Sequence, residues 1–163
     1  MYTLRCTQRL LKRLRADVTP SVHPPTTALG DWYANVLYVG RAQLVLCVSE
    51  RSLLSVLVQA KAPRELPLRV RDAVESILHR LRIPEPAIQR EVAAMSDVLV
   101  GRTLNRSVLG SMNEIAFHCR YRSGEPRVPA DLEAIALEMS EMPMLSMAVA
   151  FPSEAAAQLL GAA

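Results

Sequence analysis

The spacing of apolar residues changes from alternation to intervals of three and four along the chain, and these two periods predict its strands and helices. Three runs after Asp31 are rich in aromatic and β-branched residues and are separated by short turns, which is typical of antiparallel strands. Every residue from 44 to 48 is apolar, so we expect this strand to be central and covered on both faces. The predicted meander comprises strands at 32–39, 43–48 and 52–58.

Helical spacing occurs on both sides of this meander. Pro67 and Pro84 begin two of the helical segments, in agreement with the preference for proline in a first turn. Three prolines within residues 16–30 exclude a helix there and predict a long loop. Short strands are expected at 2–6 and 97–101, and helices at 7–15, 67–82, from near 84 to 95, at 104–119, at 130–142 and after 151.

These elements together predict an α+β fold. We expect an antiparallel meander sheet, edged by the two short strands, with helices packed on it. The chain has 163 residues, half of them hydrophobic, which is enough for one domain with a substantial core. A break containing glycine and proline follows residue 120. We therefore expect an α+β core domain at 1–120 and a helical tail at 121–163 that packs on the core or on a partner.

Charge is unevenly distributed, although the net charge is only +3. Among the charged residues, those before the first acid, Asp17, are all basic, and those after Arg127 are all acidic. This asymmetry is compatible with an anionic partner at one end or with head-to-tail association into a homo-oligomer. The longest apolar stretches are much shorter than a membrane span. We therefore expect no membrane association and a cytoplasmic location.

Familiar catalytic and metal-binding patterns are absent from the sequence. Cys6, Cys47 and Cys119 are far apart and predict free thiols, and the histidines lack metal-ligand spacing. We expect no metal and no cofactor. Cys6, next to Arg5, is either a thiol of lowered pKa or a half-buried strand cysteine, the interpretation we prefer. No GxSxG, Walker A or dinucleotide-binding pattern occurs, which leaves open whether the protein is an enzyme.

The stretch "LNRSVLGSMNEIAFHC", residues 104–119, combines polar residues with a helical pattern. Asn105 is expected to cap the helix, and the residues Arg106, Gly110 and Asn113 share a stripe beside its apolar face. A glycine inside a helix costs about 1 kcal/mol relative to alanine, which suggests close approach by a ligand or another backbone. Arg106 and Asn113 then either bind a phosphate, carboxylate or carbonyl, or they stabilise the fold while Gly110 lets the helix lie close to the sheet.

The segment "LGDWYAN" is a second candidate site. Its residues enter a predicted strand from the proline-rich loop, and they include Asp31, Trp32, Tyr33 and Asn35. Aromatic rings beside polar groups are suited to stack on a base or another planar ligand. The alternative is that Trp32 belongs to the core and has a hydrogen-bonded indole N–H. Alternation places the Trp32 and Tyr33 side chains on opposite faces of the strand, so one of these faces is expected to point outward.

Basic residues gather on the first predicted helix. Arg9, Lys12 and Arg13 surround a seam of leucines, and they form a basic patch. Such a patch either binds the phosphates of a nucleic acid or is a solvated helix face.

Three blocks of the chain resemble the signature blocks of a bacterial family that is named only as a domain of unknown function, DUF6933. The blocks are "YTLRCTQRLLKRL", "TTALGDWYANVLYVGRAQLVLCVSERSLLSVLV" and "GRTLNRSVLGSMNEIAF", and they cover about residues 2–117 in the family's order. The resemblance implies that these blocks belong to one domain. It implies no catalytic residue, substrate or cofactor, and it does not extend beyond Arg120.

We therefore expect a non-enzymatic binding or regulatory module that contacts nucleic acid or protein. The basic patch and the regions around Trp32 and Arg106 are its candidate surfaces. One alternative is a small enzyme acting on a phosphate-bearing substrate, in which the side chains that converge on a pocket are Arg106, Asn113, Asp31 and His23. Another is an oligomeric structural or interaction protein joined through its acidic, methionine-rich tail.

Overall fold

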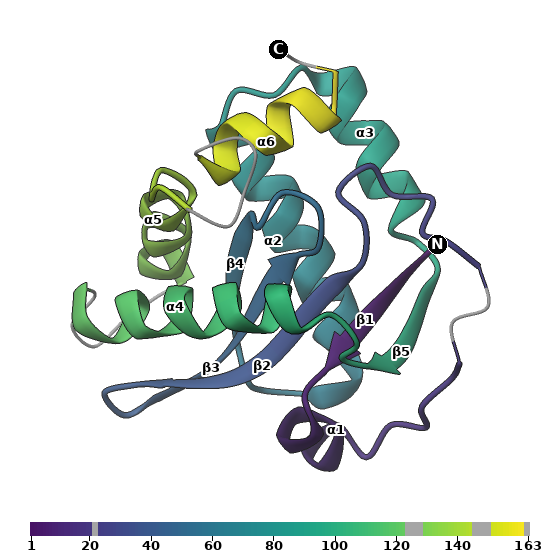
Figure 1. Cartoon of the computed structure of the whole chain (residues 1–163), viewed down its shortest axis with the longest axis vertical. Helices are drawn as coiled ribbons and strands as arrows, with labels where there is room; N and C mark the ends of the chain where they lie inside the picture. The colour runs from purple at the N-terminus through teal and green to yellow at the C-terminus, as the bar shows by residue number, and fades with distance from the viewer. Residues whose placement is uncertain (21–22, 123–128, 145–150, 162–163) are drawn as a thin grey trace.

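The computed structural model describes residues 1–20, 23–122, 129–144 and 151–161, and Figure 1 shows its elements. The strands are β1 (Tyr2–Cys6), β2 (Trp32–Val39), β3 (Ala42–Ser49), β4 (Ser55–Gln59) and β5 (Val98–Arg102). The helices are α1 (Gln8–Leu14), α2 (Leu66–Arg80), α3 (Glu85–Ala94), α4 (Arg106–Arg122), α5 (Pro129–Ser140) and α6 (Pro152–Leu159), with a 3₁₀ turn, η1 (Pro63–Glu65), before α2. Every strand and helix expected from the sequence is present, with ends displaced by a few residues.

The sheet is mixed, with strand order β4-β3-β2-β1-β5. The strands β2, β3 and β4 pair antiparallel, which confirms the predicted meander. The expectation that the whole sheet is antiparallel is wrong, because β1 pairs parallel with both β2 and β5. Residues 7–31 join β1 to β2 and include α1. This connection is long enough to carry the chain back to the same end of the sheet, so the two neighbouring strands run in the same direction.

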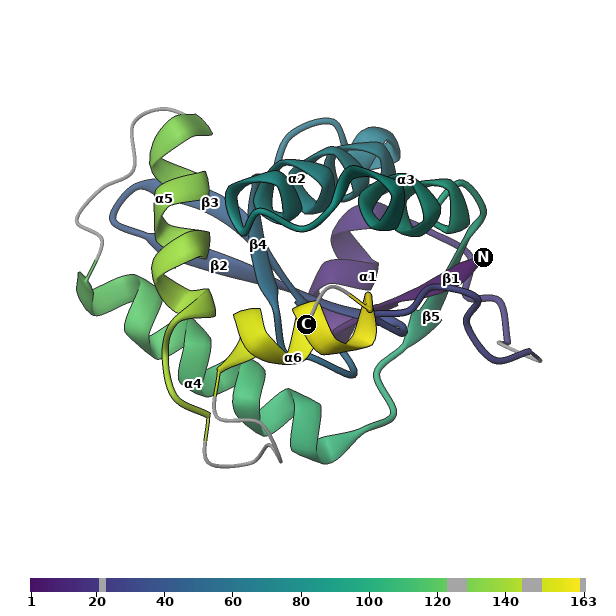
Figure 2. The same cartoon turned by 90° about the horizontal axis from the view of Figure 1, so that it is seen from above.

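Helices cover both faces of this sheet (Figure 2), and a hydrophobic cluster lies beneath each layer. Trp32 belongs to the cluster beneath α1, α2 and α3. Tyr33, on the opposite side of β2, belongs to the cluster beneath α4 and α5. Both side chains are fully buried. The expectation that one face points outward at these residues is therefore wrong, because strand alternation cannot show that a helix covers the second face.

The segment after residue 120 contributes to both clusters. Leu132 and Ile135 of α5 lie in the cluster that contains Tyr33. Ala156 of α6 lies in the cluster that contains Trp32. The boundary expected at residue 120 falls within α4. Residues on both sides of that boundary therefore belong to the same two hydrophobic clusters.

The long loop between α1 and β2 is held against the sheet and α3. Thr19 donates its N–H to the carbonyl oxygen of Val100 at 2.9 Å, which places loop backbone along β5. Further on, the buried carboxylate of Glu91 accepts the N–H groups of Ala28 and Leu29 at 2.7 and 3.1 Å. Burial raises the pKa of the Glu91 carboxyl, and these two donors oppose the rise. One side chain of α3 thus fixes the end of the loop that leads into β2.

Replacement of Glu91 by glutamine is expected to change how stability depends on pH. A raised pKa means that the folded protein binds a proton at Glu91 more tightly than the unfolded chain does. The stabilisation from this proton is present below the ordinary pKa of 4.5 and is lost as pH rises through the folded-state pKa. Urea unfolding at a series of pH values should show the wild type losing stability relative to Glu91→Gln as pH rises. A difference that does not vary with pH would contradict this.

The variant Glu91→Ala tests the hydrogen bonds themselves. It leaves the N–H groups of Ala28 and Leu29 without their acceptor, and we expect the free energy of unfolding to fall by about 2 kcal/mol at neutral pH. The exposed neighbour Glu85 provides a matched control, because Glu85→Ala removes a carboxylate that no backbone N–H depends on.

Candidate functional site

The structure places the predicted site residues in separate regions. Asp31 is buried at the entry to β2, where its carboxylate accepts the N–H of Thr3 at 2.8 Å and the Nε–H of Arg5 at 2.7 Å. Trp32 is also buried, which confirms the core interpretation of this residue. Its indole N–H, however, has no acceptor among the described residues. Asp31 therefore holds β1 beside β2, and Trp32 fills the core.

Asn35 and Tyr33 connect β2 to the start of two helices. The Oδ1 atom of Asn35 accepts the Thr7 hydroxyl at 2.8 Å, and Thr7 makes no side-chain cap for α1. The Tyr33 hydroxyl accepts the N–H of Asn105 at 3.0 Å, just before α4. Burial raises the pKa of the Tyr33 hydroxyl, so it is a neutral hydrogen-bonding group at physiological pH. Both side chains therefore position helix ends.

The polar stripe of α4 faces solvent. Asn105 caps the helix as expected, since its Oδ1 accepts two N–H groups of the first turn at 2.9 and 3.3 Å. Arg106 and Asn113 are exposed, and their side chains make no hydrogen bond or ion pair with the described residues. Gly110 is exposed too, and a Cβ atom there would meet nothing within 4 Å. The expectation that Gly110 allows close approach to the sheet is therefore wrong, because the glycine lies on the outer side of the helix.

Large apolar side chains extend this exposed stripe. Leu104, Phe117 and Tyr121 are 70%, 52% and 75% exposed. The rings of Phe117 and Tyr121 contact each other, with centroids 4.4 Å apart. The helix lies over the cluster that contains Tyr33, whereas α1 lies on the other face of the sheet (Figure 2). The stripe of α4 and the basic patch are therefore separate surfaces.

The basic patch of α1 continues into a second segment of the chain. A hollow of about 600 Å³ lies between the end of α1 and η1, and its basic lining residues are Arg13, Arg15 and Arg64. Glu65 is the acid among its lining residues. Lys61 lies next to it, in a smaller hollow that Arg13 also lines. We call the exposed residues Arg9, Lys12, Arg13, Arg15, Lys61 and Arg64 the basic surface.

The guanidinium groups of two arginines hold the second segment, residues 59–64, in place by donating to its backbone carbonyl oxygens. Arg13 donates from Nη2 to the carbonyl oxygen of Ala60 at 2.8 Å. Arg69 of α2 donates to the carbonyl oxygens of Gln59 at 2.8 Å and Ala62 at 3.0 Å, and it also bonds to that of Lys61. Ala62 has a positive φ of 38°, a conformation that non-glycine residues rarely adopt. These carbonyl contacts fix the turn that brings Lys61 and Arg64 beside α1.

An aromatic ring lies at the border of the basic surface. The guanidinium of Arg9 lies 4.9 Å from the ring centroid of Tyr38, a cation–π contact. Tyr38, near the end of β2, is 41% exposed. The sequence shows neither this pairing nor the contribution of Lys61 and Arg64, because these residues are far from α1 along the chain. The basic composition of "KAPRE", residues 61–65, is the signal that could have pointed to them.

Of the residues named for an enzyme, Asp31 is buried, whereas His23, Arg106 and Asn113 are exposed. No hydrogen bond or ion pair among the described residues links Asp31 to Arg106 or Asn113. Cys6 is a strand cysteine as preferred, but it is fully rather than half buried, and burial raises the pKa of its thiol to about 12. Within the described ranges, no group of three or more His, Cys, Asp or Glu residues could hold a metal ion. No helix in that part of the chain has the length and hydropathy of a membrane span.

Alanine at two glycine positions is expected to have opposite effects on stability. Gly110→Ala should raise the free energy of unfolding by about 1 kcal/mol, because the helix gains propensity and the new methyl group meets no atom. Gly101→Ala in β5 should lower it by about 1–3 kcal/mol, because a Cβ there lies 2.7 Å from Cγ2 of buried Thr3. Thermal and urea unfolding of both variants measure this. A loss of stability in Gly110→Ala would show that the helix is packed at this point after all.

Comparison with known proteins identifies the family but no characterised relative. A family model described as a domain of unknown function (DUF6933) matches residues 3–155. The match extends well beyond residue 117 and takes in α5 and part of α6, in agreement with the shared core. No curated protein and no solved structure is significantly similar to the chain. The chain belongs to the DUF6933 family.

Proposed function

We propose that the protein is a non-enzymatic module that binds the backbone of single-stranded nucleic acid through the basic surface. The observation that carries this proposal is the hollow of about 600 Å³ where Arg13, Arg15 and Arg64 come together from two distant segments. Guanidinium groups bind phosphate oxygens with paired hydrogen bonds, so several arginines around one hollow favour a phosphate-bearing ligand. Affinity of this kind comes from neutralised phosphates and does not require sequence readout.

The basic surface is both accessible and pre-organised. Its six side chains are exposed, so a polymer can reach them without displacing part of the fold. The turn that carries Lys61 is held by Arg69, and the contact of Arg13 with Ala60 holds that turn against α1. A site whose cations are already in position loses less conformational entropy on binding than one built from a free loop.

Tyr38 favours single strands as the ligand. Its partly exposed ring lies beside Arg9 at the border of the basic surface. Unpaired bases stack on exposed aromatic rings, whereas the bases of a duplex are already stacked on each other. We also propose a cytoplasmic location, supported by three cysteines that are free and buried, as is usual in a reducing compartment.

Removal of two exposed cations is expected to weaken binding and its salt dependence. In Lys12→Gln/Arg64→Gln, the slope of log K against log salt for labelled oligo(dT) should fall by about 1.4, because each phosphate contact contributes roughly 0.7. Affinity at low salt should fall about tenfold. Fluorescence anisotropy over a salt series measures both quantities.

The matched control is Arg80→Gln/Arg90→Gln, which removes the same charge from exposed positions outside the basic surface. It should keep most of the affinity and nearly the full slope. Equal losses in the two double variants would show that net charge alone drives binding. Failure of the wild type to bind oligo(dT) or oligo(U) at low salt would overturn the proposal, and binding of a duplex as tightly as a single strand would remove the role given to Tyr38.

A further inference from the structure

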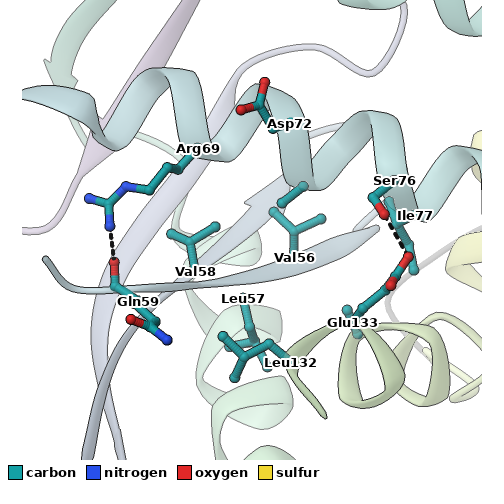
Figure 3. Close-up of a pocket in the computed structure, with 12 residues that line it drawn as sticks. Val56, Leu57, Val58, Gln59, Arg69, Asp72, Ser76, Ile77, Leu132 and Glu133 are labelled. Atoms are coloured by element: carbon teal, nitrogen blue, oxygen red, sulfur yellow. Dashed lines mark hydrogen bonds between the residues drawn. The ribbon is translucent and has the colours of Figure 1, made fainter. Parts of the chain in front are cut away.

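A groove that the proposed nucleic-acid interface does not use runs along the free edge of β4. β4 is the outermost strand of the sheet on this side, and α2 and α5 stand on either side of it (Figure 3). The groove between the helices has a volume of about 540 Å³. Residues 56–59 of β4 lie at its bottom, so the edge of a strand faces the open space.

The hydrogen-bond pattern shows which backbone groups point into this groove. Ser49 donates its N–H to the carbonyl oxygen of Leu54 at 2.9 Å, and Ala60 donates to that of Gln43 at 3.0 Å. In an antiparallel pair such bonded positions alternate, so residues 54, 56, 58 and 60 bond to β3. The N–H and C=O groups of Leu57, between them, point away from β3 and toward the groove. No strand of the described sheet lies beyond β4 to pair with them.

The two edges of the sheet differ in how their outward backbone groups are covered. At the other edge, beside β5, the loop residue Thr19 bonds to the carbonyl oxygen of Val100. At β4, Arg69 occupies one outward carbonyl, that of Gln59, at 2.8 Å. An unpaired strand edge is a template for another chain, and proteins usually cover it. Among the described residues, no strand pairs with the outward backbone groups of Leu57, a residue that is 5% exposed at the bottom of the groove.

Two hydrogen bonds set the length of the groove. The bond from Arg69 to Gln59 closes one end, and the bond from the Ser76 hydroxyl to Oε1 of Glu133, at 2.6 Å, joins α2 to α5 at the other. Residues 69 and 76 are about 10 Å apart along α2. This length accommodates roughly three residues of an extended chain.

The walls of the groove are apolar with acidic groups. Ala73 and Ile77 of α2 face Leu132 of α5 across the strand edge. Asp72 also lines the groove, with its side chain 58% exposed and in a solvent-exposed ion pair with Arg71 at 3.3 Å. The guanidinium of Arg69, by contrast, already donates to backbone carbonyl oxygens. The groove therefore favours a ligand with basic and apolar side chains over an anionic one.

We propose that this groove binds an extended segment of another protein, with alternating basic and apolar residues, as a strand added to β4. The backbone of the segment pairs with the outward groups of Leu57. The side chains of a strand alternate between the two walls, so its basic residues lie beside Asp72 on the α2 side and its apolar residues contact Leu132 on the α5 side. A second copy of this chain is a poorer occupant, because pairing two β4 edges would bring the acidic residues of two grooves together.

The test uses the full chain and a fluorescein-labelled peptide of alternating lysine and valine. We expect binding in fluorescence anisotropy together with slower amide hydrogen exchange at Leu57. The same peptide with N-methyl groups on alternate backbone nitrogens keeps its charge but loses half of its N–H donors. It should bind about tenfold more weakly or worse, because a strand adds through backbone hydrogen bonds. A glutamate–valine peptide should not bind.

Variants of the protein locate the site. Asp72→Lys should weaken peptide binding about tenfold, since it replaces an attractive charge by a repulsive one at the groove. Asp97→Lys, the same change at an exposed position near β5, should have little effect. Lys12→Gln/Arg64→Gln should bind the peptide as the wild type does, so the two proposals fail or succeed separately.

Several outcomes would overturn the proposal. Equal affinity for the N-methylated peptide would show attraction by charge alone, without strand pairing. Equal effects of Asp72→Lys and Asp97→Lys would place binding outside the groove. Sedimentation of the free protein as a dimer with Leu57 already protected from exchange would show that a second copy occupies the edge.

Discussion

Burial of β2 on both faces is the constraint on which the rest of the structure depends. Trp32 and Tyr33 alternate to opposite sides of this strand, and both are fully removed from solvent. A sheet that is apolar on both sides at its centre needs a helical layer on each side. The layers are built from segments on both sides of residue 120, which is why α5 and α6 share the core with the N-terminal strand. The surfaces left for a partner are helix outer faces and sheet edges.

Arg69 connects the two surfaces that we assign to partners. Its guanidinium holds the turn at residues 59–62, which carries Lys61 into the basic surface. The same side chain lines the groove beside β4 and closes one end of it. Arginines outnumber the acid Glu65 around the hollow beside α1, whereas the acids Asp72 and Glu133 outnumber Arg69 around the groove. The contacts of one half-buried arginine thus keep the basic surface and the groove close together but distinct.

Local features of the chain could be predicted where the interaction involves near neighbours. Asn105 caps α4 as its position suggests, because a cap depends on N–H groups two and three residues ahead. The leucines of α1 pack as their spacing indicates, with Leu10 fully buried. Gly110 could not be interpreted in this way. Its cost to the helix is evident from sequence, but whether its outer side meets a backbone or water depends on how α4 is rotated against the sheet.

The sequence by itself determined the strands, the helices, the antiparallel meander, the three free thiols and the basic character of α1, because each depends on composition or on spacings of a few residues. Only the tertiary structure decided that β1 runs parallel to its neighbours and that the carboxylate of Asp31 binds Arg5. It alone also brought Lys61 and Arg64 beside α1 to join the basic surface. It also decided that the edge of β4 opens into a groove. These outcomes depend on the direction of crossover connections and on which helix covers which face, and both are set by contacts between residues far apart in the chain.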